Sequence, residues 1–364
     1  MDSRHLVADV IDDGKVSGQQ ILVIVLCLLL NMLDGFDITA MAVVATGVAE
    51  DLALTPDRLG WIFSFALAGM MAGAMLLAPV ADIIGRRKTI IASAFLVAAS
   101  ILLTARATGL VEFILLRFAA GVGAGAMLAS QATLTAEYSP ERYRALAVAV
   151  VTAGYGVGAM LTSVAAGFIM PEYGWRGMFW FGGGVTLLLG VVAWLLIPES
   201  LKYLFERRPA NALDRVNGIL TKLGKQTLAA LPRVDKAAAR DKVSFGKTLL
   251  SLVSPEHRTA TINLWLAFFL SFVSLYFLMS WIPKLMEDAG FGAQVGRNAF
   301  FLFNLGGVVG IFVLGALSTR LKLTNLIFGS LLLAALGMIV FAAVPGQQDT
   351  LLVIIFVVGA LQQG

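Results

Sequence analysis

Two aspartates, Asp34 and Asp37, stand three residues apart inside the first long apolar stretch of the sequence. A carboxylate near the centre of a membrane-spanning helix costs about 2.5 to 3.5 kcal/mol on insertion scales, so it should face a cavity or a partner. The three-residue spacing places both side chains on one helix face, with Cβ atoms about 5 to 6 Å apart. Carboxylates this close titrate as a coupled pair, so one of them can carry a proton. The pair therefore predicts a proton-binding site; the alternative is a structural pair around the helix-breaking Gly35.

Arg117 is the residue expected to oppose these aspartates, because it lies inside another apolar stretch at a similar depth. A buried ion pair is therefore expected. A proton arriving on the aspartates would weaken their hold on Arg117 and free it for a substrate carboxylate; the alternative is a purely structural ion pair. Neither His5 nor His257 lies in an apolar stretch, so the aspartates must bear any proton relay.

The sequence has no zinc-ligand spacing, nucleophile elbow or Walker-type glycine loop. We therefore expect a protein that is not an enzyme and that needs no metal or cofactor. The net charge of +4 does not indicate nucleic-acid binding, because the Lys and Arg residues lie between apolar stretches rather than on a stripe with interleaved aromatic residues.

The elements that must position the charged residues are membrane-spanning helices. Of the 364 residues, 59% are hydrophobic and only 14% are charged, and apolar stretches near the roughly 20 residues that span a bilayer recur along the chain. The sequence therefore predicts an all-α membrane protein embedded in a lipid bilayer. The expected helices run near residues 21–48, 59–81, 89–106, 110–134, 145–170 and 177–197, and then near 259–283, 297–318, 323–344 and 350–364.

The distribution of Lys and Arg predicts the topology. Most of them lie in the N-terminus and in every second connection, which places the N-terminus in the cytoplasm. Six helices, a charged segment and further helices indicate two halves related as parallel repeats. The expected parts are a cytoplasmic N-terminus (1–20), a six-helix half (21–198), a cytoplasmic linker (199–258) and a second half (259–364).

The last apolar stretch would rise only about 22 Å as a helix, which is short for a span. We therefore expect the second half to be incomplete, with about ten helices present of an expected twelve.

Two motifs resemble those of the major facilitator superfamily. Residues 78–88 (APVADIIGRRK) resemble its signature loop after the second helix, with Ala78 where the family has Gly. Residues 315–320 look like an altered second copy, in which Thr319 replaces the acidic residue. Residues 117–123 (RFAAGVG) resemble its buried-arginine motif. The resemblance implies the major facilitator fold.

Within the superfamily, residues 33–37 (LDGFD) resemble the hallmark of the aromatic acid:proton symporter family, and three other segments fit its pattern, namely 137–144, 198–200 and 281–283. The resemblance implies proton-coupled import of benzoate-like and hydroxybenzoate-like acids across the bacterial inner membrane by alternating access, and we expect a monomer. A proton symporter of another metabolite, such as a sugar or dicarboxylate, and a membrane sensor that binds substrate without moving it remain as alternatives.

The resemblance also implies roles for other polar residues. Charges at the cytoplasmic helix ends match residues that interlock when the inner gate closes in the family, although they can also simply reach water and set the topology; they are Asp82, Arg86, Glu137, Arg142 and Arg144. Polar residues within the spans, several of them at positions that resemble cavity-facing ones, are candidates for lining the central cavity: Asn31, Gln131, Tyr155, Asn263, Tyr276, Asn304, Gln362 and Gln363.

Overall fold

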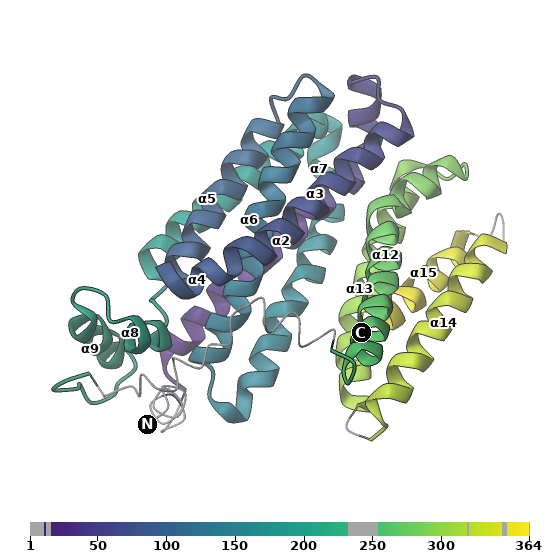
Figure 1. Ribbon diagram of the computed structural model, residues 1–364. Coiled ribbons are helices and arrows are strands. Elements are labelled where there is room, and N and C mark those ends of the chain that lie inside the picture. Colours follow the sequence, from purple (N-terminus) through teal and green to yellow (C-terminus); the bar gives the residue numbers. More distant parts are fainter. Residues whose placement is uncertain (1–10, 12–15, 232–253, 319, 344–347, 364) are drawn as a thin grey trace.

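The computed structural model describes residues 11, 16–231, 254–318, 320–343 and 348–363, and the regular structure of these residues is helical. Long helices form two neighbouring bundles, and two short helices that follow the sixth predicted span lie at one end of the first bundle (Figure 1). Within the described residues, eight helices are long and apolar enough to cross a membrane. The predicted all-α membrane fold is confirmed.

In chain order the helices are α2 (Gly18–Asp51), α3 (Pro56–Ala72), the π-helical turn η1 (Gly73–Leu77), α4 (Ala78–Ile84), α5 (Arg86–Thr104), α6 (Leu110–Tyr138), α7 (Glu141–Leu196), α8 (Leu201–Arg207), α9 (Ala212–Lys222), α12 (Arg258–Asp288), α13 (Ala293–Leu317), α14 (Leu323–Ala343) and α15 (Gln348–Gln363). The start of α2 follows from its sequence, because Ser17 and Gln20 form a reciprocal capping box. The Gln20 amide donates to Ser17 Oγ at 3.3 Å, and the Ser17 amide donates to Gln20 Oε1 at 2.8 Å.

Helix α7 contains the fifth and the sixth predicted spans. Its 56 residues would rise about 84 Å, far more than the roughly 30 Å of a hydrocarbon core. Gly174 interrupts it with φ of 60°, a backbone conformation that glycine adopts without steric cost. The predicted spans 145–170 and 177–197 therefore lie on either side of this break.

Small residues bring α2 and α7 close together. A Cβ atom on Gly35 would collide with the backbone oxygen of Tyr155, and one on Gly158 would collide with the backbone oxygen of Met32. Such close approach is expected where van der Waals packing, rather than a hydrophobic driving force, holds helices together in lipid. Helix α2, with both aspartates, is thereby held against α7.

The second bundle, α12 to α15, meets the first at the helix ends away from α8 and α9. Thr46 Oγ1 of α2 donates to Glu287 Oε2 of α12 at 2.5 Å. The rings of Phe63 and Trp281 pack edge to face with centroids 5.6 Å apart. At its other end α12 is uncovered, since every residue from 262 to 270 is exposed. The two bundles are therefore closed together at one end and separated at the other.

The polar stretch after the sixth predicted span contains two helices, α8 and α9, that the sequence analysis did not anticipate. Leu204, Phe205, Val216 and Leu220 are buried in a core that also includes Tyr138 at the end of α6. The linker thus begins as a folded cap on the first bundle (Figure 1). Residues 232–253 of the predicted linker, and Thr319, lie outside the described residues.

Candidate functional site

Arg117 of α6 forms an ion pair with Asp37 of α2. Its Nη1 donates to Asp37 Oδ1 at 2.9 Å, and the two side chains are only 3% and 5% exposed. Arg117 Nη2 reaches Thr104 Oγ1 at 3.4 Å, while the Nε atom has no partner among the described residues. The guanidinium carbon lies 5.1 Å from the centre of the Phe179 ring, a cation–π distance. The expected buried ion pair forms, and the Arg117 Nε donor remains without a partner among the described residues.

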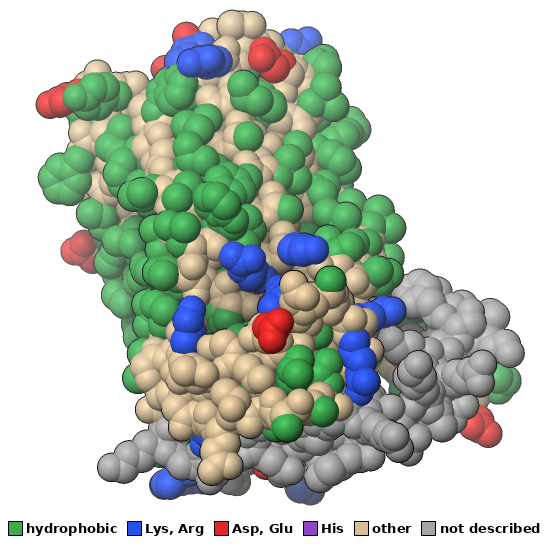
Figure 2. All heavy atoms as spheres, turned by 90° about the vertical axis from the view of Figure 1, so that its left-hand side faces the viewer, with side chains coloured by type: hydrophobic (Ala, Val, Ile, Leu, Met, Phe, Trp, Pro, Cys, Tyr) green, Lys and Arg blue, Asp and Glu red, His purple; other side chains and the backbone are tan. Residues whose placement is uncertain are grey.

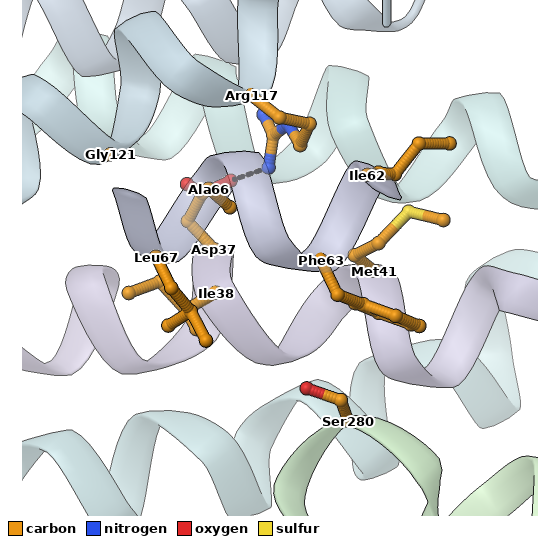
Figure 3. Close-up of a pocket in the computed structure, with 10 residues that line it drawn as sticks. All are labelled: Asp37, Ile38, Met41, Ile62, Phe63, Ala66, Leu67, Arg117, Gly121 and Ser280. Atoms are coloured by element: carbon orange, nitrogen blue, oxygen red, sulfur yellow. Dashed lines mark hydrogen bonds and ion pairs between the residues drawn. The ribbon is translucent and has the colours of Figure 1, made fainter. Parts of the chain in front are cut away.

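A small cavity opens beside this ion pair, between α2, α3, α6 and α12. Figure 3 shows Asp37 and Arg117 joined across it, with Ser280 approaching from the second bundle. Its volume is about 20 Å³ for the centres of water-sized spheres. One water needs about 10 to 15 Å³ on this measure, so the cavity has room for a water but not for an aromatic ring. The ion pair is therefore closed to an aromatic substrate in this conformation.

Asp34, the second aspartate of the predicted pair, does not contact Arg117 by a hydrogen bond or an ion pair. It is 3% exposed, and neither carboxylate oxygen has a hydrogen-bond partner among the described residues. The residue of α7 next to Asp34 is Tyr155, and Tyr155 interacts in turn with Tyr276 of α12. A buried carboxylate without a partner is costly, so Asp34 is a position that favours a proton or another donor. The two aspartates therefore have different surroundings. Asp37 is paired with Arg117, whereas Asp34 has no hydrogen-bond partner among the described residues.

Further polar atoms without partners lie toward the α8 and α9 end of α2 and α6. Cys27 lies against Thr135 and Asp37 against Arg117, so the two helices run antiparallel. Asn31 Nδ2 donates to the Val151 backbone oxygen at 2.6 Å, while its Oδ1 has no partner in the described part of the chain. Gln131 is fully buried with both amide atoms unpartnered there. Buried polar groups are usually hydrogen-bonded, so the unpartnered atoms of Asn31 and Gln131 are candidates for contacts with water or a ligand.

The polar residues predicted in the second half fall into different surroundings. Asn304 is buried and donates to the Phe300 backbone oxygen at 2.9 Å. Gln362 Nε2 donates to the Ser271 backbone oxygen at 3.0 Å, and Gln363 Nε2 donates to that of Phe303 at 3.5 Å. Asn263 lies on the exposed start of α12. In this conformation Asn263 is therefore remote from the buried site. Gln362 and Gln363 link α15 to α12 and α13 through these hydrogen bonds.

Three of the five predicted gate charges meet at one end of the first bundle. Arg86 forms ion pairs with Glu137 and, at 3.2 Å, with Asp82. Arg86 Nη1 also donates to Ser200 Oγ at 3.3 Å, and Ser200 Oγ donates to Glu137 Oε2 at 2.5 Å. All these partners belong to the first bundle and the segment that follows it. The cluster therefore ties α4, α5 and α6 together and does not join the two bundles here.

Arg142 and Arg144, the other two predicted gate charges, point elsewhere. Arg144 Nε donates to the Ala136 backbone oxygen at 3.1 Å. The guanidinium of Arg142 lies 5.3 Å from the centre of the neighbouring Tyr143 ring at the surface.

Glu199 is a member of the cluster that the sequence analysis did not assign to it. Its Oε1 accepts from the backbone amides of Arg87 and Ser200 at 3.0 and 3.1 Å, and the Tyr138 hydroxyl donates to its backbone oxygen at 2.7 Å. A Cβ atom on Gly85, whose φ is 108°, would meet the Glu199 carboxylate. The signal for Glu199 in the sequence is the segment 198–200, which resembles the family pattern but indicates no role for its carboxylate.

No group of three or more His, Cys, Asp and Glu residues that could bind a metal ion occurs in the described ranges. The carboxyl groups of Asp34 and Asp37 can exchange protons, and the guanidinium of Arg117 can bind a carboxylate.

Comparison with known proteins points to transporters. Residues 27–363 match the model of the Major Facilitator Superfamily. The chain is 31% identical to the 4-hydroxybenzoate transporter PcaK of Acinetobacter baylyi over 93% of this chain and 73% of the relative. It is 29% identical to a gallate transporter of Pseudomonas putida, covering 98% and 79%, and 28% identical to the benzoate transport protein of Acinetobacter baylyi, covering 92% and 72%.

Among solved structures, the fold is similar to the xylose transporter XylE from E. coli in a partially occluded inward open conformation. The TM-score is 0.74 at 19% identity, covering 95% of this chain and 85% of that one.

Proposed function

The chain belongs to the Major Facilitator Superfamily, and from this premise we propose that it imports small aromatic carboxylates of the benzoate and hydroxybenzoate class together with protons. It is a multi-pass membrane transporter rather than an enzyme. The substrate class is supported by relatives named for 4-hydroxybenzoate, gallate and benzoate. The observation that supports the mechanism most is the buried ion pair between Asp37 and Arg117.

Exchange of partners on Arg117 couples the proton to the substrate. A proton bound by Asp37 removes the negative charge that compensates the buried guanidinium. Leaving one member of a buried ion pair uncompensated costs about 3 to 5 kcal/mol, so Arg117 gains affinity for another anion. A carboxylate fits this requirement, because the planar guanidinium can bind it through two parallel hydrogen bonds. The substrate carboxylate thus takes the place of Asp37.

The electrical work of import favours one proton for each substrate anion. A monovalent anion entering a cell with a negative interior is opposed by about 2.3 kcal/mol per 100 mV. One accompanying proton cancels that charge, and the pH gradient then drives uptake.

Asp34 serves as a second polar position for the ring substituent or for a further proton. Both of its carboxylate oxygens are buried without hydrogen-bond partners among the described residues. A site whose buried polar groups lack partners discriminates in favour of ligands that supply them. Asp34 lies about one helical turn from Asp37, so with the substrate carboxylate on Arg117 a ring hydroxyl can reach the Asp34 carboxylate.

The proposed orientation in the membrane rests on the distribution of Lys and Arg. The Lys and Arg distribution supports a cytoplasmic N-terminus and a cytoplasmic linker at 199–258, between an N-terminal half at 21–198 and a C-terminal half at 259–364. The bundles are then closed at the outer end, through Thr46 and Glu287, and separated at the inner end. The present conformation is inward-facing, the protein works as a monomer in the bacterial inner membrane, and the Arg86 cluster is rearranged when the inner end closes.

Uptake by reconstituted protein tests the proposal. Radiolabelled 4-hydroxybenzoate and benzoate are offered to proteoliposomes with and without an inward proton gradient, with Asp37→Asn as the test variant and Asp57→Asn, an exposed carboxylate on α3, as the matched control. Gradient-driven uptake that is lost in Asp37→Asn and retained in Asp57→Asn supports the mechanism. Uptake of a sugar or dicarboxylate in place of aromatic acids would favour a symporter of another substrate class, and binding without uptake would favour a sensor.

A further inference from the structure

A second cavity lies between the end of α7, the start of α2 and helix α9. Its volume is about 280 Å³ on the measure used above, much larger than that of the cavity beside Asp37. Gln19, Arg87, Glu199, Arg215 and Lys222 contribute its polar lining. None of them belongs to the proposed substrate site, so the cavity needs its own interpretation.

The charge of this cavity is positive. Three cations, Arg87, Arg215 and Lys222, face one carboxylate, Glu199. The carboxylate is already engaged, because its Oε1 accepts from the backbone amides of Arg87 and Ser200. Arg215 approaches its Oε2 only to 3.8 Å, and the Arg215 side chain is 36% exposed. The cavity therefore has an excess of two positive charges and cationic groups with spare hydrogen-bond donors.

Helix α9 presents two of these cations, Arg215 and Lys222, on one face with an opening between them. Arg215, Gly218 and Lys222 follow at spacings of three and four residues, so they share one side of the helix. Val216 and Leu220 are buried in the core under α9. A Cβ atom on Gly218 would meet nothing within 4 Å, which leaves space between the two cations. The helix thus combines an anchored apolar side with a cationic side that has room for a ligand.

Gln19, near the start of α2, also lines the cavity. Its side-chain nitrogen Nε2 has no hydrogen-bond partner in the described part of the chain. Such a group normally finds an acceptor. A ligand with several acceptor oxygens and a negative charge satisfies Gln19, Arg215 and Lys222 together, and phosphate is the group that arginine and lysine recognise in this way.

The cavity lies where the apolar surface of the spans ends. Leu195 and Leu196, at the end of α7, line it and are 68% and 44% exposed. Figure 2 shows Lys and Arg side chains gathered around the linker helices, directly below the apolar surface of the bundle. We propose that this cavity binds a phosphate group, held by Arg215 and Lys222 with Arg87 and Gln19. The group is supplied by an anionic phospholipid headgroup or by a soluble phosphate.

Binding there would act on the Arg86 cluster through Glu199. The phosphate draws Arg215 away from Glu199, whose carboxylate holds the backbone of Arg87 and Ser200. Ser200 is bonded in turn to Arg86 and Glu137. The site therefore connects the phosphate to the charges at the inner end of the first bundle.

The test measures ligand binding to the whole purified protein in detergent, so it does not depend on the transported substrate. Microscale thermophoresis is run with dioctanoyl phosphatidylglycerol, with dioctanoyl phosphatidylcholine as the zwitterionic control, and with inorganic phosphate as the soluble source. We expect phosphatidylglycerol or inorganic phosphate to bind, and phosphatidylcholine to bind at least tenfold more weakly. Each Lys or Arg near an anionic surface raises the binding affinity about fivefold, so the double variant Arg215→Gln/Lys222→Gln should weaken binding about 30-fold.

Two further variants make the result specific. Gly218→Leu fills the opening without changing a charge and should also weaken binding at least tenfold. Lys202→Gln on α8 removes one cation outside the cavity, so it is the matched control for Lys222→Gln and should leave the affinity within twofold of the parent. Competition by inorganic phosphate assigns the site to a soluble ligand, and its absence assigns it to the lipid. Equal affinity for parent, Gly218→Leu and the double variant, with unchanged elution on size exclusion, overturns the proposal.

Discussion

The guanidinium of Arg117 donates to Asp37 at 2.9 Å, across a separation of 80 residues in the sequence. This contact joins α6 to α2 at a depth where both side chains are almost inaccessible. Because a buried charge without its partner is strongly unfavourable, the pair couples any change in the protonation of Asp37 to the ligand of Arg117.

Replacing Asp37 should abolish transport and lower stability. Asp37→Asn leaves Arg117 buried without a counter-charge, and we expect a loss of about 3 to 5 kcal/mol in the free energy of unfolding. Proteoliposome uptake and thermal unfolding in detergent measure the two effects. The double variant Asp37→Asn/Arg117→Gln should recover stability without recovering uptake. If the double variant is no more stable than Asp37→Asn, the ion pair is not the source of the loss.

Replacing Asp34 should separate proton coupling from substrate binding. Asp34→Asn removes a titratable group that has no hydrogen-bond partner among the described residues, so folding should be little affected. We expect uptake driven by a proton gradient to be lost, while exchange of labelled for unlabelled substrate, which needs no net proton movement, persists. Gradient-driven uptake at the parental rate would rule out a proton-coupling role for Asp34.

The close approach of α2 and α7 should make Gly35 intolerant of a side chain. Gly35→Ala places a Cβ atom against the Tyr155 backbone oxygen, and such overpacking costs about 1 to 3 kcal/mol. Thermal unfolding should show the loss. Gly167→Ala on α7, where a Cβ meets nothing within 4 Å, is the matched control and should be neutral or slightly stabilising. Equal stability of the two variants would contradict the packing argument.

Arg86 and Glu137 should be energetically coupled. In a double-mutant cycle with Arg86→Gln and Glu137→Gln, we expect a coupling energy of about 0.5 to 3 kcal/mol from unfolding in detergent. The cycle of Arg142→Gln with Glu137→Gln is the control and should give none, because Arg142 lies beside Tyr143. Additive effects of Arg86→Gln and Glu137→Gln would show that the contact does not stabilise the folded state.

The membrane-spanning architecture and the identity of the central charges could be predicted because the signals are local. Hydropathy over about 20 residues identifies a span, and a three-residue spacing places Asp34 and Asp37 on one helix face. The helices α8 and α9 were missed because their stability comes from packing against the end of the first bundle. Residues such as Phe205 and Val216 are buried there by residues distant in the sequence. A short polar stretch shows no comparable hydropathy signal.

The sequence by itself determined that this chain is a bundle of apolar helices with two aspartates and one arginine buried in it, because burial in lipid and helical periodicity depend on composition and spacing alone. Only the tertiary structure decided that Arg117 pairs with Asp37 and leaves Asp34 beside Tyr155. It also decided that Asn263 is exposed and that Glu199 joins the Arg86 cluster. These outcomes depend on how each helix is rotated and packed against segments far away in the chain.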